Sequence, residues 1–329
     1  MDTFNGEVMR AELVERRSRL DQAVGRGNEA AQVRALIADV DAALARLAAD
    51  TFGRCEVCHD PIEPERLIAD PLIRTCIDHL TSSERRALEQ DLDLAARIQA
   101  GLLPRRWVTV PNWEVAYHFE PAGPVGGDYC DVITPERGDG TFFVLGDVSG
   151  KGVAASILMA NLHATFRTLA EADLSLGSLM SRANRLFCQS TLDNHYATLV
   201  CGRASVGGEV EIASAGHWPA LVLRHDCVEP VGATGLALGL FCVSEYESVT
   251  LTLSSGDLLV FYSDGLCEAR GPGGDEYGVE RLTARLERLA AAGERGPARV
   301  IAACLEDLVA FRAGVALGDD LTVMVVRRT

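Results

Sequence analysis

Aspartate residues stand at the ends of apolar runs in four glycine-containing segments, and this pattern constrains the fold more than any other feature. The segments read "VGGDYCD", "LGDVSGKG", "FYSDGLCEA" and "LGDDLTVMV", with acidic residues Asp128, Asp131, Asp147, Asp264, Asp319 and Asp320. A single Asp-Gly pair is usually only a turn. Burying several carboxylates together is costly unless cations compensate their charge. Together the four segments predict strand ends that converge on metal ions.

The expected metal follows from the ligand type. The four segments contain no histidine, and hard oxygen ligands favour Mg²⁺ or Mn²⁺ over zinc. Two such ions about 3.5–4 Å apart lower the pKa of a water between them and direct it at a phosphorus atom. The sequence therefore predicts a metal-dependent hydrolase of phosphate esters.

The sequence from residue 107 onward has the pattern of a protein built on β-sheets. Short runs rich in Val, Leu, Phe and Tyr alternate with glycine turns: "WEVAYHF", "TFFVLGDV", "ATLVCGRAS", "EVEIASA", "PALVLR", "DLLVFYS" and "LTVMVV". Helical stretches come in pairs, near 151–190 and near 278–312. Strands in runs, with no alternation of strand and helix, predict an α+β fold with antiparallel sheets.

These segments resemble a known family. "GGDYCDV", "GDVSGKGVAASILMA", "SAGHWPALVLR", "FYSDGLCEAR" and "GDDLTVMVVR" resemble the PPM (PP2C-type) serine/threonine phosphatases, specifically their bacterial SpoIIE/RsbU branch, over residues 105–329. The resemblance implies a β-sandwich of two antiparallel sheets flanked by helices, with two Mn²⁺ or Mg²⁺ ions in a cleft at one end. The ligands it implies are Asp128, Asp147, Asp264, Asp319 and the backbone carbonyl of Val148. Asp147 would span both ions, and Asp131 and Asp320 would support the site.

One position departs from the eukaryotic-type branch of that family. There a histidine follows the bridging aspartate by two residues and can protonate the leaving group, whereas this chain has Ser149. The general acid is therefore unassigned. His217, in "SAGHWP", matches a family position and is expected to stabilise a turn.

A second metal site is predicted near the N-terminus. Cys55-x-x-Cys58 and, after seventeen residues, Cys76-x-x-His79 have the spacing of a closed, structural zinc site. The stretch "FGRCEVCHDPIEPERL", with the helical hairpin before it, resembles the DksA/TraR family of coiled-coil and C4-type zinc-finger proteins. This chain departs from that family in its last ligand, His79, and in a hairpin tip without the paired acidic residues that act inside RNA polymerase.

Helical segments surround this finger. Val33, Ile37, Val40, Leu44 and Leu47 follow the alternating spacing of a coiled-coil seam, and "GRGNEA" at 25–30 predicts a reversal between two antiparallel helices. Thr81 and Glu84 form a capping box that opens a helix closed by Pro104. Its stripe of Leu88, Leu92, Ala95, Gln99 and Leu102 is either a dimer seam or a face packed on its own domain. The expected parts are a hairpin (1–50), a zinc finger (51–80), a linker helix (81–104) and a phosphatase domain (105–329).

Composition narrows the possible partners and location. The formal charge of −16 disfavours a nucleic-acid binder. The N-terminus has no secretory signal, and the apolar runs are too short to cross a membrane, so a cytoplasmic protein is expected. Ten cysteines in such a protein favour metal binding over disulfides. Those outside the finger are interpreted as small core residues, among them Cys188, Cys201, Cys227, Cys242 and Cys304.

The leading functional hypothesis is a Mn²⁺/Mg²⁺-dependent phosphatase for phosphoserine or phosphothreonine. By resemblance its substrate would be a small phosphorylated regulator such as an anti-sigma factor antagonist. The zinc-finger half would then regulate a dimeric enzyme joined through the linker helix. One alternative is a zinc-finger transcription regulator that binds RNA polymerase and keeps the phosphatase fold as a scaffold. Another is a phosphoesterase for a small molecule at the same site.

Overall fold

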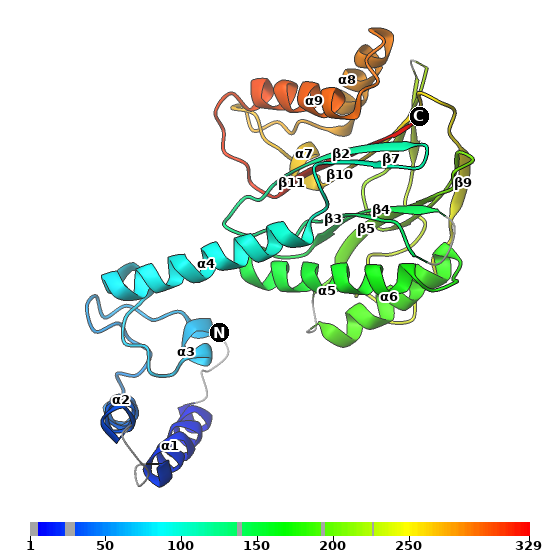
Figure 1. Ribbon diagram of the computed structural model, residues 1–329. Helices are drawn as coiled ribbons and strands as arrows, with labels where there is room; N and C mark the ends of the chain where they lie inside the picture. Colours follow the sequence, from blue (N-terminus) through cyan, green and yellow to red (C-terminus); the bar gives the residue numbers. More distant parts are fainter. Residues whose placement is uncertain (1–5, 24–29, 137–139, 192–194, 226) are drawn as a thin grey trace. The chain divides into compact units, whose positions relative to one another are not determined.

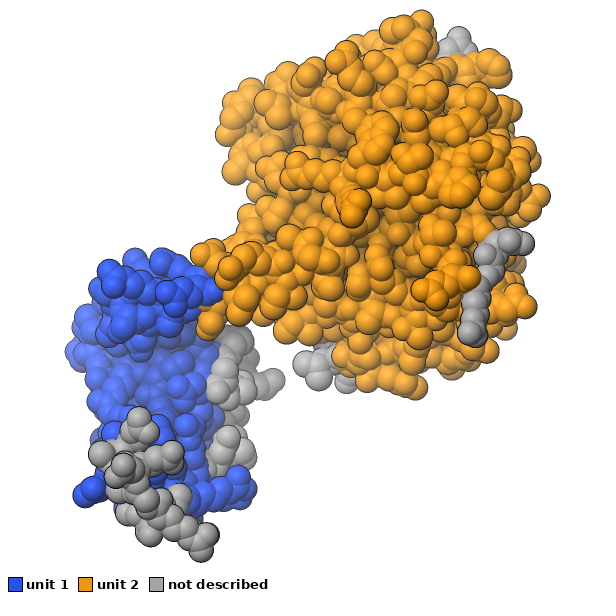
Figure 2. Space-filling view, viewed as in Figure 1, with its two compact units in different colours: residues 1–90 blue, residues 91–329 orange. Residues whose placement is uncertain are grey.

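The computed structural model describes residues 6–23, 30–136, 140–191, 195–225 and 227–329. The chain divides into two compact units, residues 1–90 and 91–329, which Figure 2 shows in blue and orange. Within the described ranges, no helix combines the length and apolar character needed to cross a membrane. The two units are described separately below.

Unit 1 contains the helical hairpin and the finger. Its elements are α1 (Gly6–Ala23), α2 (Ala30–Ala48), α3 (Pro64–Ala69), the 3-10 helix η1 (Ile77–His79) and the start of α4 (Ser82–Leu102). Val40 of the predicted seam is fully buried and packs with Leu13 of α1, because the apolar stripe faces the other helix. The reversal predicted at 25–30 lies outside the described residues except for its last position.

The helix α4 occupies the predicted linker and begins with the predicted capping box. The Thr81 hydroxyl accepts a hydrogen bond from the Glu84 N–H at 3.2 Å, and the Glu84 carboxylate accepts one from the Thr81 N–H at 2.8 Å. Near the other end, the buried Gln99 side chain donates to the Gly126 carbonyl (2.6 Å) and accepts from its N–H (3.0 Å). Leu102 packs on the core beside it. This end of the stripe therefore packs on its own domain, one of the two predicted alternatives.

Unit 2 is built on two antiparallel sheets. The six-stranded sheet has the order β1-β2-β11-β10-β7-β8, and the five-stranded sheet has the order β3-β4-β5-β6-β9. The strands are β1 (Trp107–Val110), β2 (Trp113–Glu120), β3 (Tyr129–Ile133), β4 (Thr141–Val148), β5 (Ala197–Ala204), β6 (Glu209–Ala215), β7 (Ala220–Arg224), β8 (Cys227–Val231), β9 (Val249–Thr252), β10 (Leu258–Tyr262) and β11 (Leu321–Arg328). The predicted α+β class with antiparallel sheets is confirmed.

Helices cover both outer faces of this sandwich (Figure 1). They are α5 (Gly152–Ala170), α6 (Leu176–Ser190), α7 (Asp264–Cys267), α8 (Val279–Ala291) and α9 (Pro297–Arg312). One apolar cluster joins α5 and α6 to the five-stranded sheet, and another joins α7, α8 and α9 to the six-stranded sheet. A third cluster, around Phe143 and Phe261, fills the space between the sheets. These three close-packed clusters hold the strands rigidly enough to position a site at the strand ends.

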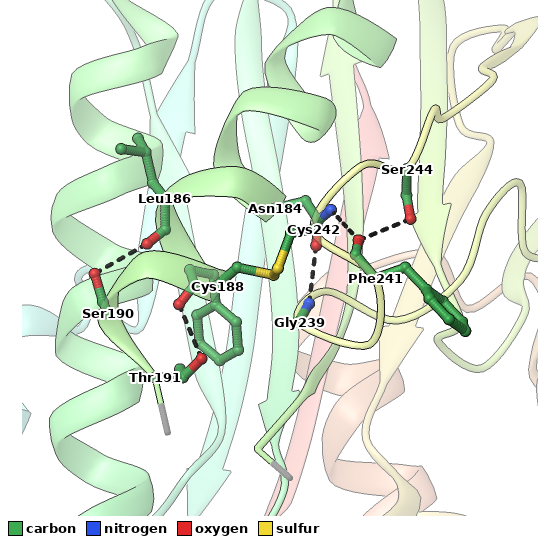
Figure 3. Close-up of a disulfide and its surroundings, with 10 residues drawn as sticks. Asn184, Leu186, Cys188, Ser190, Thr191, Gly239, Phe241, Cys242 and Ser244 are labelled. Carbon is green, nitrogen blue, oxygen red and sulfur yellow. Dashed lines mark hydrogen bonds between the residues drawn. A yellow bond between two sulfur atoms is a disulfide. The ribbon is translucent and has the colours of Figure 1, made fainter. Parts of the chain in front are cut away.

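Some cysteines of unit 2 are not the single core residues that the sequence predicted. Cys188 of α6 and Cys242, between β8 and β9, form a disulfide (Figure 3), so their interpretation as single core residues is wrong. Asn184 holds the same segment, since its side chain donates to the Phe241 carbonyl (2.7 Å) and accepts from the Gly239 N–H (2.8 Å). Cys227 is exposed and was also misassigned to the core, whereas Cys201 and Cys304 are buried as expected.

Candidate active site

The predicted aspartates lie at strand ends of both sheets. In the five-stranded sheet, Asp128 directly precedes β3 and Asp147 is next to last in β4. In the six-stranded sheet, Asp264 follows β10 as the first residue of α7, and Asp319 lies just before β11. An open cleft of about 470 Å³ lies at this end; its lining is Asp147, Val148, Ser149, Gly150, Lys151, Tyr196, Thr198, Gly216, His217, Trp218, Pro219, Asp264 and Asp319. The structure thus brings three of the four aspartates to one cleft.

Asp128, the fourth, lies behind the cleft surface and is fully buried. One carboxylate oxygen, Oδ2, accepts a hydrogen bond from the Thr322 hydroxyl, while Oδ1 is buried without a partner in the described structure. Burial, and then the nearby charge of Asp147, raise the pKa of Asp128 well above its usual value. A buried carboxylate oxygen without a hydrogen-bond donor is suited to bind a cation, which would compensate the cost of its burial.

The other carboxylates also repel one another. Burial, followed by the charges of Asp264 and Asp319, raises the pKa of Asp147 to about 8. Burial and Asp319 raise the pKa of Asp264 to about 6. Carboxylate oxygens in this arrangement suit a hard divalent cation, whose charge would offset the repulsion. The residues present therefore fit the predicted Mn²⁺ or Mg²⁺ ions.

Asp320 has a structural role next to the site. Its buried carboxylate accepts hydrogen bonds from the N–H groups of Ala122 (2.8 Å) and Gly127 (2.6 Å). A Cβ atom at Gly126 would lie 2.5 Å from Asp320 Oδ2, so the loop needs glycine there. Asp320 thus holds the loop that leads into Asp128.

Asp131 lies outside the cleft lining. Its buried carboxylate accepts two hydrogen bonds from Arg167 of α5, both at 2.9 Å, and one from the Tyr129 hydroxyl at 3.3 Å. This bidentate pair ties α5 to β3. Its support of the site is therefore limited to anchoring the strand that follows Asp128.

The Val148 carbonyl faces the loop before Asp128. A Cβ atom at Gly127 would lie 2.9 Å from that oxygen, so only glycine allows the two backbones to approach so closely. Val148 also lines the cleft, with Asp147 before it. This placement is compatible with the predicted carbonyl ligand.

Lys151 was not singled out from the sequence, although the structure places it in the cleft. Its ammonium nitrogen lies 2.9 Å from Asp319 Oδ2 and donates to the Gly318 carbonyl. The segment "GKG" after Asp147 was the available signal, because a lysine directly before a helix and beside acidic groups can attract an anion. Ser149, in the position of the missing histidine, accepts a hydrogen bond from the Tyr196 N–H at 2.9 Å and so stabilises the loop.

The second metal site lies in unit 1. Cys55, Cys58, Cys76 and His79 each offer one ligand atom, and these atoms all lie within 4.8 Å of one another. Burial disfavours a thiolate at Cys55, but the N–H groups of Cys58, Cys76 and Val57 outweigh it and lower the pKa of Cys55 to about 6. Three sulfurs and one imidazole nitrogen match the ligand types of a closed, structural zinc site.

Taken together, the antiparallel sandwich and the acidic cleft define unit 2 as a PP2C-like domain. A profile described as "Stage II sporulation protein E (SpoIIE)" matches residues 137–329, more than half of the chain. The chain therefore belongs to the SpoIIE family. A second profile, "Prokaryotic dksA/traR C4-type zinc finger", matches residues 50–78. Both resemblances predicted from the sequence are confirmed.

Individual relatives agree with this assignment. The chain is 25% identical to Protein IcfG of Synechocystis sp. over 269 residues, covering 72% of this chain but only 41% of IcfG. It is 24% identical to Phosphoserine phosphatase RsbU of Bacillus subtilis over 244 residues, covering 73% of this chain and 71% of RsbU. The SiaA-PP2C domain of Pseudomonas aeruginosa has the same fold, with a TM-score of 0.65 at 19% identity, covering 75% of this chain and 98% of that domain.

Proposed function

We propose that the chain is a metal-dependent protein phosphatase that hydrolyses phosphoserine or phosphothreonine monoesters. The observation that carries this proposal is the buried, partnerless oxygen of Asp128 beside Asp147, behind a cleft that gathers strand ends from both sheets. When bound, two Mn²⁺ or Mg²⁺ ions would supply Lewis acidity, lowering the pKa of a water and offsetting the charge of a phosphoryl group.

The side chains of the protein would hold the metal ions and orient the phosphoryl group. Asp128, Asp147, Asp264, Asp319 and the Val148 carbonyl would be the metal ligands. Asp147 would span both ions, because it lies close enough to Asp128, Asp264 and Asp319 for their charges to influence one another. The exposed ammonium group of Lys151 at the rim would attract and orient an anionic phosphoryl group. The lining of the cleft is open enough to admit a side chain from another protein.

The relatives support the proposed substrate class. RsbU is described as a phosphoserine phosphatase, which supports a phosphoserine-containing protein as the substrate of this chain. We extend this to a small regulator of the anti-sigma factor antagonist type. Cys55, Cys58, Cys76 and His79 would hold one structural Zn²⁺, and unit 1 would be the regulatory or partner-binding part. The homodimer would form through exposed apolar residues of α4, of which Leu88 belongs to the predicted stripe and Leu94 and Ile98 lie outside it.

The RNA polymerase alternative is less well supported. A scaffold has no need of four acidic ligands around a cleft, and carboxylates that repel one another cost stability when they serve no purpose. A small-molecule phosphoesterase would use the same cleft, and only the substrate separates it from a protein phosphatase.

The test compares a phosphoserine protein or peptide with p-nitrophenyl phosphate in the presence of Mn²⁺. Asp147→Asn should abolish hydrolysis of both, whereas Asp275→Asn, in an exposed turn, should leave it intact. Preference for the phosphoprotein by kcat/KM would support the proposal. Hydrolysis of small phosphate esters alone would favour the alternative, and activity that persists after a chelator has removed both Mn²⁺ and Mg²⁺ would contradict the two-metal site.

A further inference from the structure

His217 lies in the turn where the chain passes from one sheet to the other, between β6 and β7. It lines the cleft, yet only 4% of its surface is exposed. Gly216 makes the turn possible with a φ of +62°, and a Cβ atom there would lie 2.9 Å from the Ala237 nitrogen. The local backbone thus places the imidazole ring in the lining of the cleft that Asp147 and Asp264 also line.

Both ring nitrogens of His217 are engaged. Nε2 lies 3.1 Å from the Tyr262 carbonyl oxygen, and Nδ1 lies 2.8 Å from the Thr198 hydroxyl oxygen. Because a carbonyl oxygen only accepts hydrogen bonds, Nε2 must carry the proton and donate it. Nδ1 of the neutral ring is then an acceptor, and the Thr198 hydroxyl donates to it.

The two partners belong to different sheets, and each lies next to an acidic residue of the cleft. Thr198 of β5 is directly opposite Asp147 in the β4–β5 register, so the two side chains share one face of the five-stranded sheet. Tyr262 ends β10 in the six-stranded sheet, two residues before Asp264. One imidazole therefore connects the strand beside Asp147 to the strand that presents Asp264.

We propose that His217 is a positioning residue that fixes the separation of Asp147 and Asp264, and thereby sets the affinity of the cleft for divalent cations. The inference rests on the proposed function, because it assumes that these aspartates hold metal ions. Residues that orient metal ligands through hydrogen bonds typically affect metal affinity or activity by about 10–100-fold.

A role in proton transfer fits less well. Burial lowers the pKa of His217 to about 4, so the ring stays neutral under ordinary conditions. Its Nε2 proton is committed to a backbone carbonyl, and its Nδ1 lone pair is committed to Thr198. Neither nitrogen is left for the leaving group.

The test measures Mn²⁺ binding directly by isothermal titration calorimetry in the full chain. His217→Ala removes both hydrogen bonds, and Thr198→Val removes only the hydroxyl at almost constant shape. Thr198→Ser keeps the hydroxyl. Thr234→Val is the matched control, since the Thr234 hydroxyl is also hydrogen-bonded, to the backbone of Ser214, but lies outside the cleft lining. Thermal unfolding without Mn²⁺ reports the stability of each variant.

We expect His217→Ala and Thr198→Val to weaken Mn²⁺ binding by about 10–100-fold, with Thr198→Ser and Thr234→Val close to wild type. The Mn²⁺ concentration for half-maximal hydrolysis should rise in parallel. If His217→Ala fails to fold, Thr198→Val decides the question. If the folded variants bind Mn²⁺ as tightly as the wild type and differ only in a lower unfolding temperature, the role of His217 is overturned while the proposed function stands. Absence of Mn²⁺ binding by the wild type would overturn the proposed function and the inference with it.

Discussion

The two candidate metal sites are assembled in opposite ways. The ligands of the finger come from one short stretch, residues 55–79, and their atoms already lie within 4.8 Å of one another. Those of the cleft are predicted to come from strand ends between residues 128 and 319, and among the described residues no cluster of three or more acidic side chains is packed as tightly as the four finger residues. A wider spacing suits two ions instead of one.

The two sites also differ in the interactions that stabilise them. The finger has a very small apolar core, in which Cys55, Ile62, Leu67 and Cys76 are buried, and two of these four are predicted zinc ligands. A core of that size does not stabilise a fold without a metal or another cross-link. The cleft instead lies at the edge of three large apolar clusters. A metal would therefore build the first site, whereas the fold builds the second one.

The largest predicted effect comes from zinc removal. Structural zinc in small finger domains contributes about 10–16 kcal/mol of binding free energy that is also folding free energy. Cys76→Ser should therefore unfold residues 52–80 and leave the sandwich folded. Hydrogen exchange by mass spectrometry would show lost protection in the finger peptides and unchanged protection in β4 and β10. Retained protection of the finger would contradict the comparison.

The carboxylates of the cleft should make the stability of unit 2 depend on pH. Without Mn²⁺ the raised pKa values of Asp147, about 8, and Asp264, about 6, mean that the folded state binds more protons than the unfolded state. The free energy of unfolding should therefore fall as pH rises from about 4 to about 8. Saturating Mn²⁺ should flatten this fall, because the cations offset the carboxylate charges.

Tryptophan fluorescence during chemical denaturation measures this effect in unit 2 alone, because the three tryptophans, Trp107, Trp113 and Trp218, all lie there. Asp147→Asn should flatten the slope without Mn²⁺, and Asp275→Asn should not. A slope that is the same with and without Mn²⁺ would show that the cleft does not bind the cation through these groups.

A smaller effect is expected from the disulfide, which strengthens the sandwich independently of any metal. Cys188 and Cys242 are 54 residues apart, and closing a loop of that length stabilises a fold by about 2–4 kcal/mol. Cys188→Ser should lower the unfolding free energy of unit 2 by that amount, as should reduction of the wild type. Cys227→Ser, at an exposed free cysteine, is the control. Equal stability of oxidised and reduced protein would exclude this contribution.

The predictions from the sequence rested on signals that are local in the chain. The Asp-Gly segments, the paired zinc ligands and the capping box at Thr81 each carry their signal within a few residues. Strand runs such as "TFFVLGDV" and "DLLVFYS" were recognised because both faces of β4 and β10 are buried.

Contacts between distant segments were beyond such reasoning. Nothing in the sequence pairs Cys188 with Cys242, or Gln99 with Gly126, because only the folded chain brings them together. His217 was interpreted as a turn residue, and it does lie in a turn. Its connection to Thr198 and Tyr262 depends on strand register, which the sequence does not reveal.

The central claim is that aspartates from both sheets hold two divalent cations. Equilibrium dialysis with Mn²⁺, followed by elemental analysis of manganese and zinc, tests it most directly. We expect two manganese ions and one zinc ion per wild-type chain. Asp147→Asn should lose manganese and keep zinc, and Asp275→Asn should match the wild type. A wild-type chain that retains zinc but binds no manganese would contradict the account.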